Sequence, residues 1–389
     1  MALRVLQSST LPPVKPLVRC YYWGEANPVV NLGDFLVPSL INALGYSCAL
    51  SQTNDSVVIN PGRCLTVVGS LLTRHEIARI GYPLDVWGCG WRGKELSPTG
   101  QEDVRFFAVR GPQTAAGLHL SSQIALGDPA LLLPHLVPLD VAPHGRTVVI
   151  PHFSRLSAMS ESQRRLKTGC DEVLSPMVLR SPRDKTLWRC SLKTAVGLLH
   201  RRIRYGIQIH SLWSALRRIA GADFVLTGSL HGAILSQTFG VPWAAYHDGY
   251  VDTPPKWTDW AAYLGIDIEL VQTLRDGRNW WRQSGYRGRV RDLEPLLKSF
   301  PYEIRNPTVW SLVRKGAFGN AGDKKNRLQL GSILGSWESR QTGRSYHLSS
   351  TNRMDVEAAS LSRFKPLPFA RRSRRRICAP AVFVSTSRA

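Results

Sequence analysis

The amino-acid sequence predicts an α/β fold in which parallel sheets form two domains. Short apolar, β-rich runs end in glycine-containing turns at residues 65–70, 84–90 and 224–229, and helix-like segments follow several of them. This alternation is typical of doubly wound parallel sheets. At 389 residues the chain is long enough for two domains with separate cores. Residues 136–145 are rich in proline and polar breaks, and predict the linker between the domains.

In the first half, residues 18–23 predict a strand and residues 35–44 a helix that ends at Gly45. Pro38 is compatible with this helix because the first turn needs few internal N–H donors. Asp34 is expected to cap the helix with its carboxylate, and a role in substrate binding is the alternative. Further strands are predicted at residues 65–68, 84–87 and 106–109, and a short apolar strand is predicted just before Asp128.

Two of these strands lead directly into charged residues. Arg110 follows residues 106–109, where a guanidinium can bind a carboxylate or phosphate through two parallel hydrogen bonds. A salt bridge that packs the two domains together is the alternative. Asp128 follows a short apolar strand and precedes a proline, so we expect a turn and helix cap first and a ligand contact second.

The second half is organised around residues 223–246, which predict a compact strand–turn–helix–strand unit. The strands are expected at 224–227 and 241–246, and the helix at 231–239. Ligands of open α/β sheets bind beyond the carboxyl ends of the strands, and a helix N-terminus there favours anions. Ser229, Leu230 and His231 occupy this position and therefore predict an anion site.

The remaining segments carry weaker signals. A strand at 146–152 brings His152 to its carboxyl end, where a structural role is commoner than a catalytic one. Residues 184–220 are arginine-rich and largely helical, which predicts a solvated face, with an anionic membrane as the alternative partner. Residues 302–389 show little periodicity and predict a basic, largely disordered tail. Truncation at Pro301 is therefore expected to leave folding and activity intact.

The net charge of +22 points to phosphates, acidic sugars or an anionic membrane surface as partners, although more than half of it lies from Tyr302 onward. Nucleic acid is not an expected partner, because no recognition module accompanies the basic run at 371–376. The seven cysteines lack the spacing of a zinc site or a disulfide framework. No signal peptide or membrane span is evident, so a cytoplasmic protein is expected, with any membrane contact peripheral at the inner face.

An ordered set of motifs carries a family resemblance. The motifs are NLGD at 31–34, VVGSLL at 67–72, VWGCG at 86–90, AVRGPQT at 108–114, LGDPALLLP at 126–134, PHF at 151–153, TGSLHGAI at 227–234 and KWTDW at 256–260. Their content and order resemble those of bacterial polysaccharide pyruvyl transferases. The resemblance covers roughly residues 17–301 and is more specific than any single motif.

The resemblance implies a fold and a reaction. The family moves the enolpyruvyl carbons of phosphoenolpyruvate onto two sugar hydroxyls as a ketal and releases phosphate. Its fold resembles the GT-B arrangement, in which two Rossmann-like domains face each other across a cleft. Here residues 17–138 would form the acceptor side and residues 145–301 the donor side. The acceptor would be a saccharide, free or lipid-linked, and neither a cofactor nor a metal ion is implied.

The resemblance also implies roles for individual residues. His231 would act as general acid and base, and Arg110 would clamp the donor. Since the positive end of a helix dipole disfavours an imidazolium, His231 is expected to become protonated mainly when the dianionic donor is bound. Some branches of the family carry arginine where this chain has Ser229, so a second cation must come from elsewhere. The further donor-binding residues would be Ser229, Leu230, His152 and Lys256, and the acceptor-binding residues Asn31 and Asp34.

Two other functions fit the same sequence. A nucleotide-sugar glycosyltransferase shares the expected two-domain architecture. A catalytically inactive glycan-binding paralogue is the alternative that is not an enzyme.

Overall fold

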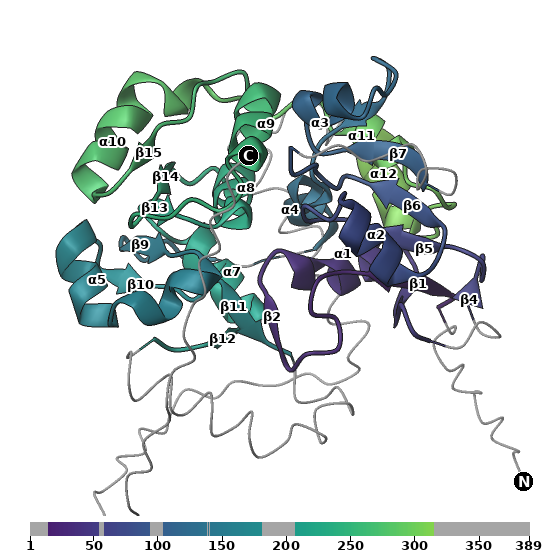
Figure 1. Cartoon of the computed structure of the whole chain (residues 1–389), viewed down its shortest axis with the longest axis horizontal. Helices are drawn as coiled ribbons and strands as arrows, with labels where there is room; N and C mark the ends of the chain where they lie inside the picture. Colours follow the sequence, from purple (N-terminus) through teal and green to yellow (C-terminus); the bar gives the residue numbers. More distant parts are fainter. Residues whose placement is uncertain are drawn as a thin grey trace, which may run out of the picture. The chain divides into compact units, whose positions relative to one another are not determined.

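Two parallel sheets organise the fold, and strands and helices alternate through both (Figure 1). The computed structural model describes residues 15–53, 58–93, 104–137, 139, 141–180 and 207–314. All of these residues lie within one compact unit. The α/β class with parallel sheets that the sequence predicts is therefore confirmed.

The first sheet is built from the first half of the chain. Its strands run in the order β3 (Ser47–Leu50), β1 (Leu17–Tyr21), β5 (Cys64–Thr66), β6 (Leu84–Trp87), β7 (Val104–Val109) and β8 (Ala125–Leu126), and β4 (Val58–Ile59) also pairs with β1. Every pairing is parallel. The helical segments of this half are η1 (Asp34–Leu36), α1 (Val37–Ala43), α2 (Arg74–Ile80), α3 (Pro112–Gly117), η4 (Pro129–Leu132) and α4 (Leu133–Leu136).

The second sheet is built from the second half of the chain. Its parallel strands run in the order β10 (Glu172–Val173), β9 (Thr147–Ile150), β13 (Phe224–Thr227), β14 (Trp243–Tyr246) and β15 (Leu270–Val271). Its helical segments are η5 (Phe153–Ala158), α5 (Glu161–Thr168), α7 (Leu212–Ala220), α8 (Leu230–Phe239), α9 (Pro254–Leu264), α10 (Leu274–Gln283) and η7 (Gly285–Arg287). The four residues of β13 are all buried, as the apolar run at this position predicts.

A third, small sheet joins the two halves through the backbone. Strand β2 (Val29–Asn31) of the first half pairs antiparallel with β11 (Met177–Leu179), which pairs in parallel with β12 (His210–Ser211). The apolar core is continuous across both halves. The predicted basic helical stretch is described only from residue 207 onward, where α7 lies, and its residues 184–206 lie outside the described part. Among the described residues, no helix has the length and apolar character needed to span a bilayer.

The end of the described chain returns to the first sheet. Helices α11 (Glu294–Lys298) and α12 (Pro307–Arg314) lie beside it, as Figure 1 shows. The indole N–H of Trp87 donates to the carbonyl of Leu296 at 2.9 Å, and Tyr46 Oη donates to the carbonyl of Glu303 at 2.6 Å. Ile304, Val309 and Leu312 are buried.

Residues 302–314 were expected to begin the disordered tail, and the structure corrects this. They are part of the packed unit because α12 buries Val309 and Leu312, which are spaced three residues apart on one helix face. One short helix contributes only a few apolar positions, so it leaves little periodic pattern in a long basic segment. Residues 315–389, the rest of the predicted tail, lie outside the described residues.

Candidate active site

A cavity of about 300 Å³ brings the predicted site residues together. All eight line it: Asn31, Asp34, Arg110, His152, Ser229, Leu230, His231 and Lys256. Most of them lie at or just beyond the carboxyl ends of strands, which is where ligands of α/β sheets bind. A larger cavity of about 470 Å³, lined by α1, α4, α7 and α12, contains none of them.

His231 lies in the first turn of α8 and is buried. Its Nε2 atom is 3.6 Å from Oδ2 of Asp128, and both atoms are buried and have no hydrogen-bond partner among the described residues. The other carboxylate oxygen of Asp128 accepts the N–H of Ala130 at 3.0 Å, so the predicted cap is confirmed. Asp128 therefore places a carboxylate oxygen beside the imidazole ring.

Gly33 makes room for this histidine. A Cβ atom at residue 33 would lie 1.9 Å from Nδ1 of His231, much closer than any real contact. The glycine of the NLGD motif thus packs directly against the histidine of the TGSLHGAI motif. Spacing along the sequence contains no sign of this contact, because the two residues are separated by nearly 200 positions.

The structure corrects the predicted role of Asp34 as a helix cap. The capping position of η1 is Gly33, and the Asp34 carboxylate makes no capping hydrogen bond, because the helical segment begins at Asp34 itself. Asn31 accepts the N–H of Gly33 at 3.1 Å instead. Burial raises the pKa of Asp34 to about 6, although the positive charge of His231 opposes this and the nearby Asp128 carboxylate adds to it.

This raised pKa predicts a pH-dependent gain in stability for Asp34→Asn. Ionisation of Asp34 is harder in the folded state, so the free energy of unfolding falls as the pH rises from about 4 to about 6. The difference between the folded and unfolded pKa of Asp34 lowers the free energy of unfolding by at most about 3 kcal/mol. Urea unfolding should show equal stability of the two proteins near pH 4 and a more stable variant at pH 7.5. A difference that does not change with pH would contradict the assignment.

Arg110 connects the two halves and also faces the cavity. It is fully buried, its Nη1 donates to Ser70 Oγ at 2.9 Å, and its Nε lies 3.4 Å from Oδ2 of Asp259. Asp259, the acidic residue of the KWTDW segment, also accepts from the backbone N–H and the hydroxyl of Thr114 at 2.9 and 2.7 Å. The packing salt bridge considered as an alternative is therefore present. Nη2 of Arg110 has no hydrogen-bond partner among the described residues, so one donor group remains for a ligand.

Gly90 leaves the space that the guanidinium of Arg110 occupies. A Cβ atom at residue 90 would lie 2.0 Å from Nη2 and 2.1 Å from Cζ of Arg110. We expect Gly90→Ala to displace the guanidinium and to raise the KM for an anionic substrate by about tenfold or more, the loss of one charge-assisted hydrogen bond. The matched control is Gly62→Ala, since a Cβ atom there would meet nothing within 4 Å. The KM for the anionic substrate is measured with the other substrate at saturation. Equal KM values for Gly90→Ala and Gly62→Ala would refute the role given to Gly90.

Lys256 and His152, the predicted sources of a second cation, share one carboxylate. Asp252 accepts from Nζ of Lys256, and its Oδ2 is 3.5 Å from Nε2 of His152. Burial would raise the pKa of Asp252, but the hydrogen bond from His152 and the charge of Lys256 outweigh it and hold the pKa well below its usual range. Burial lowers the pKa of Lys256. The sequence missed Asp252, whose only signal is its spacing of four residues from Lys256.

Ser229 and Arg92 complete the electrostatics of the cavity. Ser229 stands at the capping position of α8, but its side chain makes no capping hydrogen bond. Its N–H donates to Thr227 Oγ1 at 3.1 Å. Arg92 lines the same cavity with an exposed side chain, and none of the described residues forms an ion pair with it. Arg92 is therefore a further cation of this site that motif reasoning did not identify.

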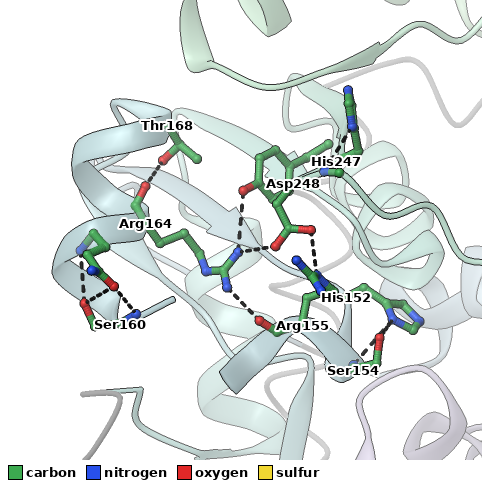
Figure 2. Close-up of polar contacts among 11 residues, drawn as sticks. His152, Ser154, Arg155, Ser160, Arg164, Thr168, His247 and Asp248 are labelled. Carbon is green, nitrogen blue, oxygen red and sulfur yellow. Dashed lines mark hydrogen bonds and ion pairs between the residues drawn. The ribbon is translucent and has the colours of Figure 1, made fainter. Parts of the chain in front are cut away.

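A buried ionic cluster holds one wall of the cavity (Figure 2). Asp248 accepts from Nε of Arg155 and from Nη1 of Arg164, both at 3.1 Å. Nη2 of Arg164 donates to the carbonyl of Arg155 at 2.8 Å, and Nδ1 of His152 is 2.8 Å from Ser154 Oγ. The cluster joins η5 and α5 to the loop after β14. This loop contains Asp252, which lines the cavity.

The fold and the cavity define an α/β protein in which a buried arginine and a histidine beside a buried carboxylate line one cavity. A sequence profile of the polysaccharide pyruvyl transferase family matches residues 3–246. This is more than half of the chain, and the chain belongs to that family. The resemblance that the ordered motifs indicated is therefore confirmed.

Comparison with individual proteins gives more distant matches. The chain is 25% identical over 254 residues to the succinoglycan biosynthesis protein ExoV of Rhizobium meliloti (strain 1021), and the match covers 63% of this chain and 65% of the relative. An uncharacterized protein from Klebsiella pneumoniae has 14% identity and a TM-score of 0.34, over 66% of this chain and 93% of its own. A UDP-GlcNAc 2-epimerase from Methanocaldococcus jannaschii has 11% identity and a TM-score of 0.34, over 79% and 100%.

Proposed function

We propose that the protein transfers the pyruvyl group of phosphoenolpyruvate to two hydroxyls of a sugar in an exopolysaccharide or its precursor. The observation that carries this proposal is one cavity lined by His231, Arg110, Lys256 and Arg92, with the buried Asp128 carboxylate beside the imidazole of His231. Phosphoenolpyruvate has a carboxylate and a phosphate on three carbons, so its site needs several cations in a small space. Membership of the family and the relative named for succinoglycan biosynthesis support a polysaccharide acceptor.

In this proposal the two parallel sheets are the cores of two lobes in a GT-B-like arrangement. The lobe around residues 17–138 would bind the acceptor, and the lobe around residues 145–301 would bind the donor. Asn31 and Asp34 come from the first and His231 and Lys256 from the second, yet all four line the same cavity. The donor and the acceptor would thus bind side by side in a cavity that residues of both lobes line.

The chemistry requires one proton to be delivered and two to be removed. His231 would protonate the methylene carbon of the donor, and the electrons of the double bond would form the new C–H bond. The adjacent carbon becomes an oxocarbenium-like centre, which a first sugar hydroxyl attacks. The bond from that carbon to the phosphate oxygen then breaks, its electron pair leaves with the phosphate, and a second oxocarbenium-like centre forms. The second hydroxyl attacks this centre and closes the ketal, while its proton passes to the departing phosphate. Asp128 would stabilise protonated His231, and Asp34, with a pKa of about 6, would accept a hydroxyl proton.

Incubation of the purified full-length protein with phosphoenolpyruvate and a panel of glucose-, galactose- and mannose-containing oligosaccharides tests the proposal. We expect phosphate release that depends on the acceptor, and a product heavier than the acceptor by one pyruvate less one water. Parallel reactions with nucleotide sugars are the control. Transfer of a sugar from those donors, without phosphate release from phosphoenolpyruvate, would establish the glycosyltransferase instead. Oligosaccharide binding without turnover on either donor would favour the inactive paralogue.

A further inference from the structure

Three aromatic side chains form a row on the wall of the cavity, and the reaction described above uses none of them. They are Trp23, which follows β1, Phe153, which begins η5, and Tyr250, in the loop after β14. The ring centroids of Trp23 and Phe153 are 5.3 Å apart. The ring of His152 continues the row, at 4.4 Å from Phe153 and 5.4 Å from Tyr250.

The exposure of these rings sets them apart from the core. Phe153 is 36% and Tyr250 41% exposed, and among the described residues only five large aromatic side chains are exposed to this degree. Exposing such area to water is unfavourable unless another apolar surface covers it. The open side of the row faces the cavity, so a ligand in the cavity can supply that surface.

The chemistry of the two substrates decides which of them can cover the row. An apolar wall adds little to the binding of a small dianion, which binds instead through the cations of the cavity. A pyranose ring differs, because the C–H groups of one face form an apolar patch while its hydroxyls remain at the edge. Stacking this face on aromatic rings removes apolar area from water and leaves the hydroxyls free to react.

The row is held in place before any ligand binds. Arg155, two residues after Phe153, donates to Asp248, two residues before Tyr250, so the two segments are bound to each other (Figure 2). His152 is fixed on one ring nitrogen by Ser154 and on the other by Asp252. A preformed surface binds with less loss of conformational freedom than one that must be ordered.

We propose that Trp23, Phe153 and Tyr250 form a stacking subsite for a pyranose ring of the acceptor saccharide. The proposal rests on the proposed function only in taking the saccharide as the acceptor of the reaction. Because Trp23 comes from the first half of the chain and the other two rings from the second, the subsite is complete only when both halves contribute to the cavity. It presents the sugar to the same cavity in which His231 and Arg110 lie.

Binding of simple glycosides to the full-length protein tests the subsite without any turnover. The probes are methyl β-D-glucopyranoside and methyl β-D-galactopyranoside, observed by saturation-transfer NMR. We expect transfer to be strongest on the C–H protons of one ring face, and affinity to fall by about tenfold in Trp23→Ala and in Tyr250→Ala. Tyr250→Phe should bind like the parent, because stacking does not need the hydroxyl. Trp213→Ala is the matched control, since Trp213 is 37% exposed and lines the other cavity. Unchanged affinity in both alanine variants would overturn the proposal.

Steady-state kinetics with phosphoenolpyruvate and an active oligosaccharide provide a second readout. Trp23→Ala and Tyr250→Ala should raise the KM for the saccharide by about tenfold and leave the KM for phosphoenolpyruvate unchanged. An equal rise in both KM values would show a general distortion of the cavity and refute a saccharide subsite. If glycoside binding is lost in the alanine variants but no turnover is found with any acceptor, the subsite stands and the proposed reaction fails.

Discussion

Replacement of His231 by glutamine should lower kcat for pyruvyl transfer by about 10²–10⁴-fold, the usual contribution of a general acid–base residue. Glutamine preserves a polar side chain of similar length but cannot deliver a proton to the methylene carbon. Phosphoenolpyruvate should still bind, because Arg110 and the N-terminus of α8 remain. Stopped or continuous phosphate-release assays give kcat, and equilibrium titration of the donor gives its Kd. Unchanged kcat would remove His231 from the chemistry, and loss of donor binding would make it a binding residue.

Two further variants separate proton transfer from packing at this position. Asp128→Asn keeps the shape beside Nε2 of His231 and removes the negative charge, so it should lower kcat and shift the pH–rate profile. Gly33→Ala should lower kcat by moving the ring, since its Cβ atom would overlap Nδ1, without a shift in the pH–rate profile. Identical pH–rate profiles for Asp128→Asn and the parent would contradict the role given to this carboxylate.

Truncation after Pro301 should prevent folding, whereas truncation after Arg314 should not. The shorter chain loses Ile304, Val309 and Leu312, all of them buried against the first half. Truncating one buried aliphatic side chain to alanine costs about 2–5 kcal/mol, and a typical domain has a net stability of about 5–15 kcal/mol. The shorter chain also loses the hydrogen bonds that Arg305 and Asn306 donate to the carbonyls of Leu44 and Ala43, and the one that Tyr46 donates to the carbonyl of Glu303.

Soluble yield and thermal unfolding of the two truncated proteins measure this effect. The protein that ends at Arg314 retains every described element and should unfold cooperatively, like the full chain. Leu312→Ala in the full chain should lower the free energy of unfolding by about 2–5 kcal/mol. A soluble, cooperatively unfolding protein that ends at Pro301 would show that the sequence-based boundary was the better one.

The sequence predicted the parallel α/β class and most of the strands that carry the site. The expected strands at 84–87 and 224–227 match β6 and β13 residue for residue, because these short, wholly buried strands are mostly apolar and end in clear turn signals. The eight site residues line one cavity, and most of them lie at or just beyond the carboxyl ends of strands, where ligands of α/β sheets bind. Their assigned roles remain predictions.

Other features depend on partners that are distant in the sequence. Asp34 has the residue type and position of a helix cap, yet burial beside Asp128 and His231 leaves it as an acid with a raised pKa. Asp252 lies outside every motif and still contacts both Lys256 and His152. In α12, the first half of the chain provides the surface that makes a short apolar pattern part of the core.

The sequence by itself determined the α/β class, many of the strands of the two parallel sheets, the family, and most of the residues that stand at the strand ends. Hydrophobic periodicity, turn residues and motifs are local properties, so they can be read from neighbouring positions. The tertiary structure alone decided the pairings: His231 with Asp128 and Gly33, Arg110 with Asp259, and the aromatic row of Trp23, Phe153 and Tyr250. These contacts join residues far apart in the chain, and their energies depend on the burial and geometry that only packing of both halves creates.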